Sequence, residues 1–292
     1  MTELQDDLTK LSKLFWQASF KLQFAADQFA SASALCAQFL HEGHAGVRQE
    51  FDPSTSIYRL FMFAERLPGN VPMLIGGGIH SLRSALDTAV SMLVREAGAD
   101  GELRVNFPVH GSQKELIASF GDGKRTCPDC KVTRPQKATN RIIRQKLPDL
   151  ERIIIEVFQA WRDGNYPLWA LSKLDNLQKH QNLLLVATTN SLSVDFYTAE
   201  GYISQGCLWK IQTGQTVEIA ASRSEITLTS EPSFGSELLF PEGIPFGGKP
   251  VFEVLEELFE LVRGILVILQ AHFEGDQSAF ADGTPSSFKI AI

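Results

Sequence analysis

The sequence predicts an α+β fold in which a helical bundle carries an inserted antiparallel β meander. Three observations predict this fold class. The segments 4–41, 74–97 and 252–273 repeat apolar residues at the 3.6-residue period of a helix. Residues 183–240 consist instead of short β-prone runs separated by Gly, Asn and Ser. Because helical periodicity returns after residue 250, the β segment is an insertion within a helical sequence.

The first part of the chain supplies the main helices of the predicted bundle. Residues 4–41 predict one long helix, because no Pro or Gly follows Met1 until Gly43 and the apolar residues are interleaved with alanines. The run "SIYRLFMFAE" (56–65) predicts a strand, and "RLPGNVP" turns the chain. We expect the next helix, 74–97, at the centre of the bundle beside the N-terminal and C-terminal helices. Its apolar stripe consists of Ile75, Ile79, Leu82, Leu86, Val90, Leu93 and Ala97.

Shorter helices, the β meander and a closing helix follow. We predict a short helix at 112–120 and longer helices near 139–163 and 167–181. Residues 183–240 predict a meander of about five antiparallel strands, with the run at 56–65 as a further candidate strand. The final helix spans 252–273. We expect one α+β domain over 1–292, made of a bundle and a meander. The bundle covers 1–182 and 251–273, with one strand near 56–65, and the meander covers 183–240.

Composition places the chain among ordinary globular proteins. Hydrophobic residues make up 44% of the 292 residues and charged residues 21%, which argues against disorder. The start "MTELQDDLTKLSK" is acidic and lacks the pattern of a signal peptide. The most apolar stretch, "LVRGILVILQAHF", is interrupted by Arg263 and is too short to span a bilayer. Four cysteines in this length do not make a disulfide scaffold. We therefore expect a cytoplasmic protein without a membrane partner.

Positive charge is concentrated in residues 124–146, here called the basic segment. The chain has a net charge of −7, but this segment alone carries +7, so the remainder carries −14. Local charge density decides whether a phosphate backbone is attracted, so RNA binding is one interpretation. A solvated basic loop and helix face is the other. The basic side chains are those of Lys124, Arg125, Lys131, Arg134, Lys137, Arg141, Arg144 and Lys146.

Polar residues gather on the central helix in "GGGIHSLRSALDT" (76–88). At 100° per residue, His80, Arg83 and Asp87 share one flank of the apolar stripe, and Arg83 and Asp87 can pair directly. The three side chains are candidate catalytic groups, and the other reading is that Arg83 and Asp87 form a half-buried salt bridge that orders the bundle. The glycines lack a nucleotide-binding pattern, so we expect them to let another backbone pack closely.

A second polar cluster, "LDNLQKHQN" (174–182), closes the predicted helix near 167–181. It combines an acid, an amide, a cation and an imidazole in Asp175, Asn176, Lys179 and His180. His180 is a further candidate catalytic group, and Asn176 and Lys179 are candidate binding groups. We predict a shared site, in which His80 and Arg83 lie within a hydrogen bond or one bridging water of Asn176 or His180.

Both motifs resemble those of a large bacterial and phage-associated protein family. "GGGIHSLRSALDTAVSMLV" resembles its hallmark helix, G-D-x-L-H-N-L-R-S-A-L-D-H-L. "LDNLQKHQ" is similar to its later element L-D-N-I-D-K-H-R. The order of elements also fits the family: N-terminal helix, strand, hallmark helix, "FPV" segment, helices, meander and C-terminal helix. The matching positions of the later element are Leu174, Asp175, Asn176, Lys179 and His180.

The hallmark helix further resembles the Arg-x4-His motif of HEPN-type helical bundles, many of which are metal-independent endoribonucleases or nucleotide-binding proteins. Arg83 matches the arginine, whereas Thr88 stands where the motif has histidine. Gly77, Gln178 and Gln181 also replace charged family residues. In that chemistry the imidazole transfers a proton of a ribose 2′-hydroxyl. The resemblance therefore implies weak or absent cleavage in this chain.

The cysteines offer one weak metal candidate. Cys127 and Cys130 have the spacing of half a zinc site, but no second pair of ligands with suitable spacing completes it. A free or dimer-bridging pair in a loop is the other reading. Since the chain also lacks the common hydrolase and NTPase motifs, we expect no metal and no cofactor.

Three functional hypotheses remain open. The first is an RNA-binding HEPN-like protein or degenerate endoribonuclease, in which Arg83 contacts phosphate and His80 or His180 transfers protons. The second is a protein that binds a small ligand without catalysis at the pocket of His80, Arg83, Asp87 and His180. The third is a structural or homodimeric interaction protein.

Overall fold

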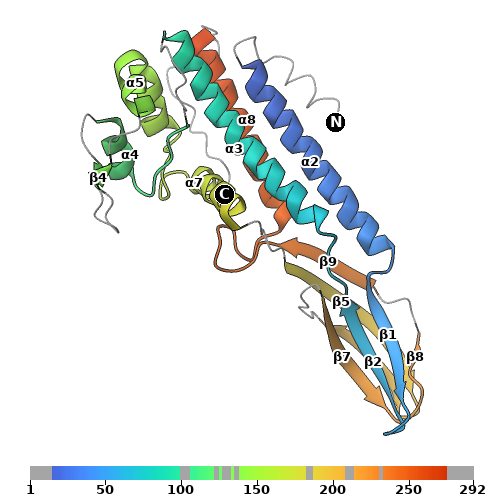
Figure 1. Cartoon of the computed structure of the whole chain (residues 1–292). Helices are drawn as coiled ribbons and strands as arrows, with labels where there is room; N and C mark the ends of the chain where they lie inside the picture. Colours follow the sequence, from blue (N-terminus) through green and yellow to red (C-terminus); the bar gives the residue numbers. More distant parts are fainter. Residues whose placement is uncertain are drawn as a thin grey trace. The chain divides into compact units, whose positions relative to one another are not determined.

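The computed structural model has an α+β fold made of a helical bundle and antiparallel strands, as predicted (Figure 1). It describes residues 15–98, 106–121, 125–126, 133–134, 138–181, 187–207, 214–229 and 233–274. Two compact units make up the chain. The first comprises Met1–Ala26, Gly78–Asn176 and Glu256–Ile292, and the second comprises Asp27–Gly77 and Leu177–Leu255. The division falls within helices instead of at the predicted bundle and meander limits, and the predicted single domain stays a prediction.

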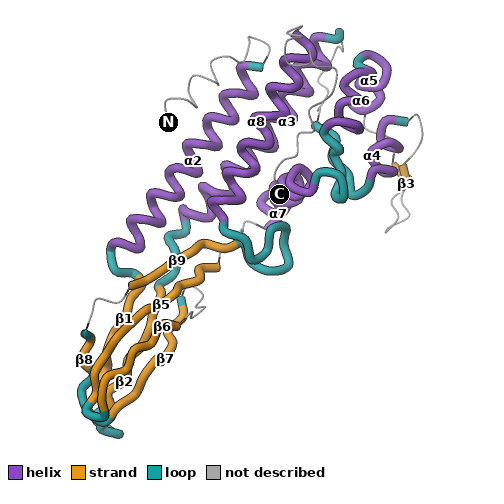
Figure 2. The backbone as a smooth tube through the Cα atoms, turned by 180° about the vertical axis from the view of Figure 1, so that it is seen from behind, coloured by secondary structure: helices purple, strands orange, loops and turns teal. Residues whose placement is uncertain are grey.

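Three long helices lie side by side in the first unit: parts of α2 (Trp16–His41), α3 (Asn70–Glu96) and α8 (Val251–Glu274) (Figures 1 and 2). Ile79, Leu82 and Leu86 of α3 are fully buried, which confirms the predicted stripe. Lys21 Nζ of α2 donates a hydrogen bond to Ser84 Oγ of α3 over 2.8 Å. Within the described residues, no helix is both long enough and apolar enough to cross a membrane.

Helix α3 begins earlier than its sequence predicts. It starts at Asn70 and not near 74, and it therefore includes Pro72. Proline is tolerated in the first turn because the N–H that it lacks has no partner inside the helix there. The glycines Gly76–Gly78 consequently lie within α3 and not at its start. Of the predicted helix 4–41, the part before Phe15 lies outside the described residues.

Smaller helices complete the first unit: α4 (Gln113–Phe120), α5 (Ala138–Lys146), α6 (Pro148–Arg152), the π-helical η1 (Ile153–Val157) and α7 (Tyr166–Gln181), whose last residues belong to the second unit. A two-stranded ribbon, β3 (Arg125–Thr126) with β4 (Thr133–Arg134), precedes α5. The single helix predicted near 139–163 is wrong. Pro148 holds Leu147 out of the helical region, at φ −134°, so the chain breaks into α5 and α6.

Two antiparallel sheets share a core in the second unit. The first has the order β1-β2-β7, formed by β1 (Ala45–Asp52), β2 (Ile57–Ala64) and β7 (Gln215–Ser222). The second is centred on β5 (Ala187–Thr198), which pairs with β6 (Gly201–Cys207), β8 (Thr227–Leu228) and β9 (Ser233–Leu239). The shared core contains Leu60, Met62, Ala64, Phe196, Ile219 and Ile226.

The strand arrangement refines the predicted meander in three ways. Residues 187–189, the described end of the run "LLLVATT", and the run "SVDFYT" belong to one long strand, β5, in place of two. Strand β7 pairs with β2 and so joins the other sheet. Strand β1 has no counterpart in the sequence analysis. It pairs with β2 alone within the described residues, and an edge strand needs no alternating apolar pattern.

Candidate functional site

The two polar motifs meet at His80 and Asp175. His80 Nδ1 of α3 lies 2.8 Å from Asp175 Oδ1 of α7. The Asp175 side chain is 3% exposed, whereas the His80 side chain is 51% exposed. A buried carboxylate thus orients an imidazole that reaches solvent. Since Nδ1 is committed to Asp175, Nε2 is the ring nitrogen left to meet a substrate. We call this pair the His80–Asp175 dyad.

The two motifs meet as predicted, through Asp175. The predicted contacts with Asn176 or His180 stay predictions. Asn176 is exposed on α7, one residue beyond the buried Asp175. Each helical residue turns by 100°, so neighbouring side chains leave the helix in different directions. Lys179 is exposed further along α7, and the side chain of His180 lies outside the described residues.

Arg83 holds a neighbouring segment and does not face solvent. Its Nη2 donates to the carbonyl oxygen of Phe107 over 2.6 Å and lies 2.9 Å from Asp87 Oδ1. Asp87 Oδ1 in turn accepts the backbone N–H of Phe107 over 2.7 Å. The three residues form what we call the Arg83 clamp. It satisfies both backbone groups of Phe107 and fixes the "FPV" segment against α3.

Burial has two further consequences for Arg83. Desolvation lowers the pKa of its guanidinium, and the carboxylates of Asp87 and Asp175 act in the opposite direction. Its Nη1 atom is also buried and has no hydrogen-bond partner among the described residues. In this arrangement Arg83 is not available to a phosphate group. The prediction that Arg83 and Asp87 pair is confirmed, in the form of a structural salt bridge.

The glycines of α3 make room for two glutamine side chains. A Cβ atom at Gly76 would collide with the side-chain amide of Gln178, and one at Gly77 would lie 2.8 Å from Gln28 Nε2. The expectation of a close backbone is therefore wrong at Gly76 and Gly77, because side-chain amides fill this space. Gln178 belongs to the "LDNLQKHQN" cluster, so the two motifs also meet here.

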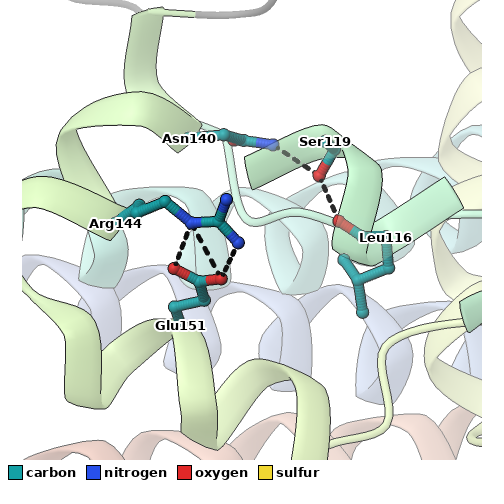
Figure 3. A network of polar contacts seen from close by, with 5 residues as sticks. All are labelled: Leu116, Ser119, Asn140, Arg144 and Glu151. Carbon is teal, nitrogen blue, oxygen red and sulfur yellow. Dashed lines mark hydrogen bonds and ion pairs between the residues drawn. The ribbon is translucent and has the colours of Figure 1, made fainter. Parts of the chain in front are cut away.

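The described part of the basic segment is largely engaged in internal contacts. Figure 3 shows the guanidinium of Arg144 paired with the carboxylate of Glu151, with Nε 3.0 Å from Oε2. Nearby, Asn140 donates a buried hydrogen bond to Ser119. Lys146 Nζ donates to the carbonyl oxygen of Gly98 over 2.6 Å, and Arg141 is exposed. Lys124, Lys131 and Lys137 lie outside the described residues, as do the side chains of Arg125 and Arg134.

The metal candidates, Cys127 and Cys130, also lie outside the described residues. Among the residues that are described, no group of three His, Cys, Asp or Glu side chains is arranged to hold a metal ion. Thr88, the position of the missing histidine, is half-buried on α3. Among the predicted catalytic residues whose side chains the structure describes, only His80 both reaches solvent and contacts a buried carboxylate.

Comparison with models of protein families, with curated proteins and with solved structures finds no match. The site is therefore interpreted from its own geometry and from the motifs of the sequence.

Proposed function

We propose that the protein acts on RNA and that His80 is its proton-transfer group. One observation carries the proposal: the 2.8 Å contact that joins the half-exposed His80 ring to the buried Asp175 carboxylate. A buried acid on one ring nitrogen sets the tautomer and orientation of the imidazole, and this leaves the other nitrogen to face a substrate as a proton acceptor.

The reaction class follows from this base and from the resemblance to HEPN-type bundles. His80 Nε2 accepts the proton of a ribose 2′-hydroxyl, and the oxygen attacks the adjacent phosphorus. The bond from phosphorus to the 5′-oxygen breaks, and that oxygen takes up a proton from the imidazolium or from water. The products are a 2′,3′-cyclic phosphate and a 5′-hydroxyl, and no external reactant is needed. Asp175 stabilises the imidazolium formed in the first step.

We expect a low rate for this chemistry. General base catalysis contributes about 10²- to 10⁴-fold on its own. The resemblance implies that Arg83 is the cation that stabilises the developing charge on the phosphate. In this structure, however, the Arg83 side chain is bound to Asp87 and to the backbone of Phe107. Exposed Arg141 and the net charge of +7 on the basic segment attract phosphate, which speeds association more than it lowers the barrier.

The test is RNA cleavage in the presence of EDTA, with His80→Gln as the diagnostic variant. Glutamine can still hydrogen-bond Asp175 but cannot transfer a proton. The matched control is His41→Gln, which changes an exposed histidine of α2. We expect slow cleavage by the wild-type protein and by His41→Gln, and a loss of about 10²-fold or more in His80→Gln. Equal cleavage by wild type and His80→Gln would overturn the assignment, provided both variants melt like the wild type.

A second candidate function is RNA binding without catalysis, and the Arg83 clamp favours it. A hallmark arginine bound internally to Asp87 and Phe107 orders the bundle instead of contacting substrate. On this reading the wild-type protein retains RNA at low salt but does not cleave it. An absence of both cleavage and low-salt retention would exclude both candidates and leave a structural or homodimeric role.

A further inference from the structure

Helix α7 presents an aromatic and cationic surface that neither motif includes. Tyr166 is 38% exposed and its ring centroid lies 5.6 Å from that of Trp169. Arg162 Cζ lies 5.1 Å, and Lys173 Nζ 5.7 Å, from the centroid of the Trp169 ring. We call Arg162, Tyr166, Trp169 and Lys173 the α7 platform. Two cations therefore lie over one partly exposed indole.

The platform lies on the outward face of α7. Leu168, Leu171, Leu174 and Asp175 make the buried face of the helix. Tyr166, Trp169 and Lys173 follow at intervals of three and four residues, so they share one stripe, and Tyr166 and Lys173 are exposed. Three of these side chains are thus not needed to fill the core, where aromatic residues of a helix usually lie.

Charge distinguishes the platform from an ordinary helix surface. Neither Arg162 nor Lys173 forms an ion pair with a carboxylate among the described residues, although Asp163 adjoins Arg162 and Asp175 lies two residues from Lys173. In a chain of net charge −7, two cations thus lie over one aromatic ring with no carboxylate paired to either among the described residues. A surface of this kind attracts an anionic ligand that also carries flat rings.

We propose that the α7 platform binds single-stranded RNA by stacking bases on Tyr166 and Trp169 while Arg162 and Lys173 contact the phosphates. Proteins that bind single strands combine these two elements, because every base offers a face for stacking and every linkage carries a charge. A duplex hides its base faces and is not expected to bind here. The proposal rests on the proposed action on RNA and specifies its substrate as unpaired RNA.

The platform and the His80–Asp175 dyad are connected through α7. Trp169 and Asp175 are six residues apart, which is about 9 Å along the helix axis and about 120° around it. A strand with a rise of about 3.4 Å per nucleotide covers this axial separation with about three nucleotides. A short single strand that stacks on Trp169 and bends round α7 therefore brings a neighbouring linkage toward His80.

The experiment measures binding separately from cleavage. The probe is a fluorescein-labelled 2′-O-methyl RNA of about 12 nucleotides, a length within the site sizes of single-strand binders. The blocked 2′-hydroxyl cannot attack phosphorus, so anisotropy reports the dissociation constant alone. The variants are Trp169→Ala, Trp169→Phe and Lys173→Ala. The control is Trp16→Ala, which removes an indole that is 49% exposed on α2.

We expect the dissociation constant to rise about 5- to 150-fold in Trp169→Ala and to stay near the wild-type value in Trp169→Phe and Trp16→Ala. Lys173→Ala should reduce the slope of log affinity against log salt by about 0.7, the value for one phosphate contact on a single strand. Wild-type affinity in Trp169→Ala, an equal loss in Trp16→Ala, or equally tight binding of the annealed duplex would each overturn the platform.

The same probe separates this proposal from the proposed function. If Trp169→Ala loses binding, and His80→Gln binds like the wild type while its cleavage of ordinary RNA is lost, both proposals stand. If Trp169→Ala binds and cleaves like the wild type, the platform is wrong and the dyad is untouched. If the wild type binds the probe and Trp169→Ala does not, but His80→Gln cleaves ordinary RNA normally, the platform stands and the catalytic assignment fails.

Discussion

Replacing Arg83 by methionine tests whether this arginine stabilises the fold or binds phosphate. The substitution keeps much of the buried volume but removes both the hydrogen bond to the Phe107 carbonyl oxygen and the ion pair with Asp87. The Phe107 carbonyl then loses this hydrogen-bond donor. Asp87 keeps its bond to the Phe107 N–H but loses a cation 2.9 Å away. The Arg83 clamp is thereby opened from one side.

The magnitude follows from burial. Removing one member of a buried ion pair costs about 3–5 kcal/mol, because the remaining charge is left uncompensated. The Asp87 side chain is 25% exposed, so water relieves part of this cost and we expect the lower end, about 3 kcal/mol. For a chain of this size, about 3 kcal/mol corresponds to a fall in Tm of roughly 6–12 °C.

The assay is thermal unfolding followed by circular dichroism. RNA retention is then measured at a temperature about 20 °C lower than the Tm of the less stable of the two proteins. Arg95→Met is the matched control, since Arg95 is exposed on the same helix and its replacement should change stability by about 0.5 kcal/mol or less. A wild-type Tm in Arg83→Met together with lost RNA retention would refute the clamp and restore Arg83 as a phosphate ligand. Retention should instead be unchanged in the folded variant.

Two further predictions concern titratable groups away from the dyad. The hydrogen bond that His44 donates to the Glu65 carboxylate raises the pKa of His44 above its ordinary 6.5, so the contact is fully present below that pH and is lost as pH rises through the folded pKa. Glu65→Gln should return the NMR-monitored pKa of His44 toward 6.5, and an unchanged pKa would contradict the contact. Burial raises the pKa of the Cys36 thiol to about 11, so about one thiol in a thousand is ionised at pH 8. Peptide mapping after iodoacetamide treatment should find Cys36 labelled only in denaturant, and prompt labelling of the folded protein would count against its burial.

Helical periodicity predicted the elements that pack by a continuous apolar stripe. Helices α3 and α8 follow their predicted ranges to within a few residues, because burial of one face repeats along the whole helix. Strand β1 left no such signal. Its sequence, "AGVRQEFD", alternates poorly because it pairs at the edge of a sheet and much of its length is exposed.

The sequence predicted which motifs form the candidate site, but it did not predict which residues of the two motifs contact one another there. Spacing placed Arg83 and Asp87 together, since four residues make about one helical turn. The contact of Arg83 with the backbone of Phe107 joins residues that are distant in sequence, and a carbonyl group has no sequence signature. The sequence did not single out Trp169 for a related reason. An aromatic residue on a helix is usually read as a core residue, and only the structure places Arg162 and Lys173 over its ring.

The pairing of β2 with β7 imposes an order of events on synthesis. Ala64 is joined to Gln215, so about 150 residues, including α3 to α7, must be made before this sheet can close. At about 5–20 residues per second, the β1–β2 hairpin waits roughly 8–30 s with one edge of β2 unpaired. An open strand edge is a site for wrong association. Newly made protein should therefore depend on chaperones during this interval. Slower translation of the segment from α3 to α7 should lower the yield of folded protein.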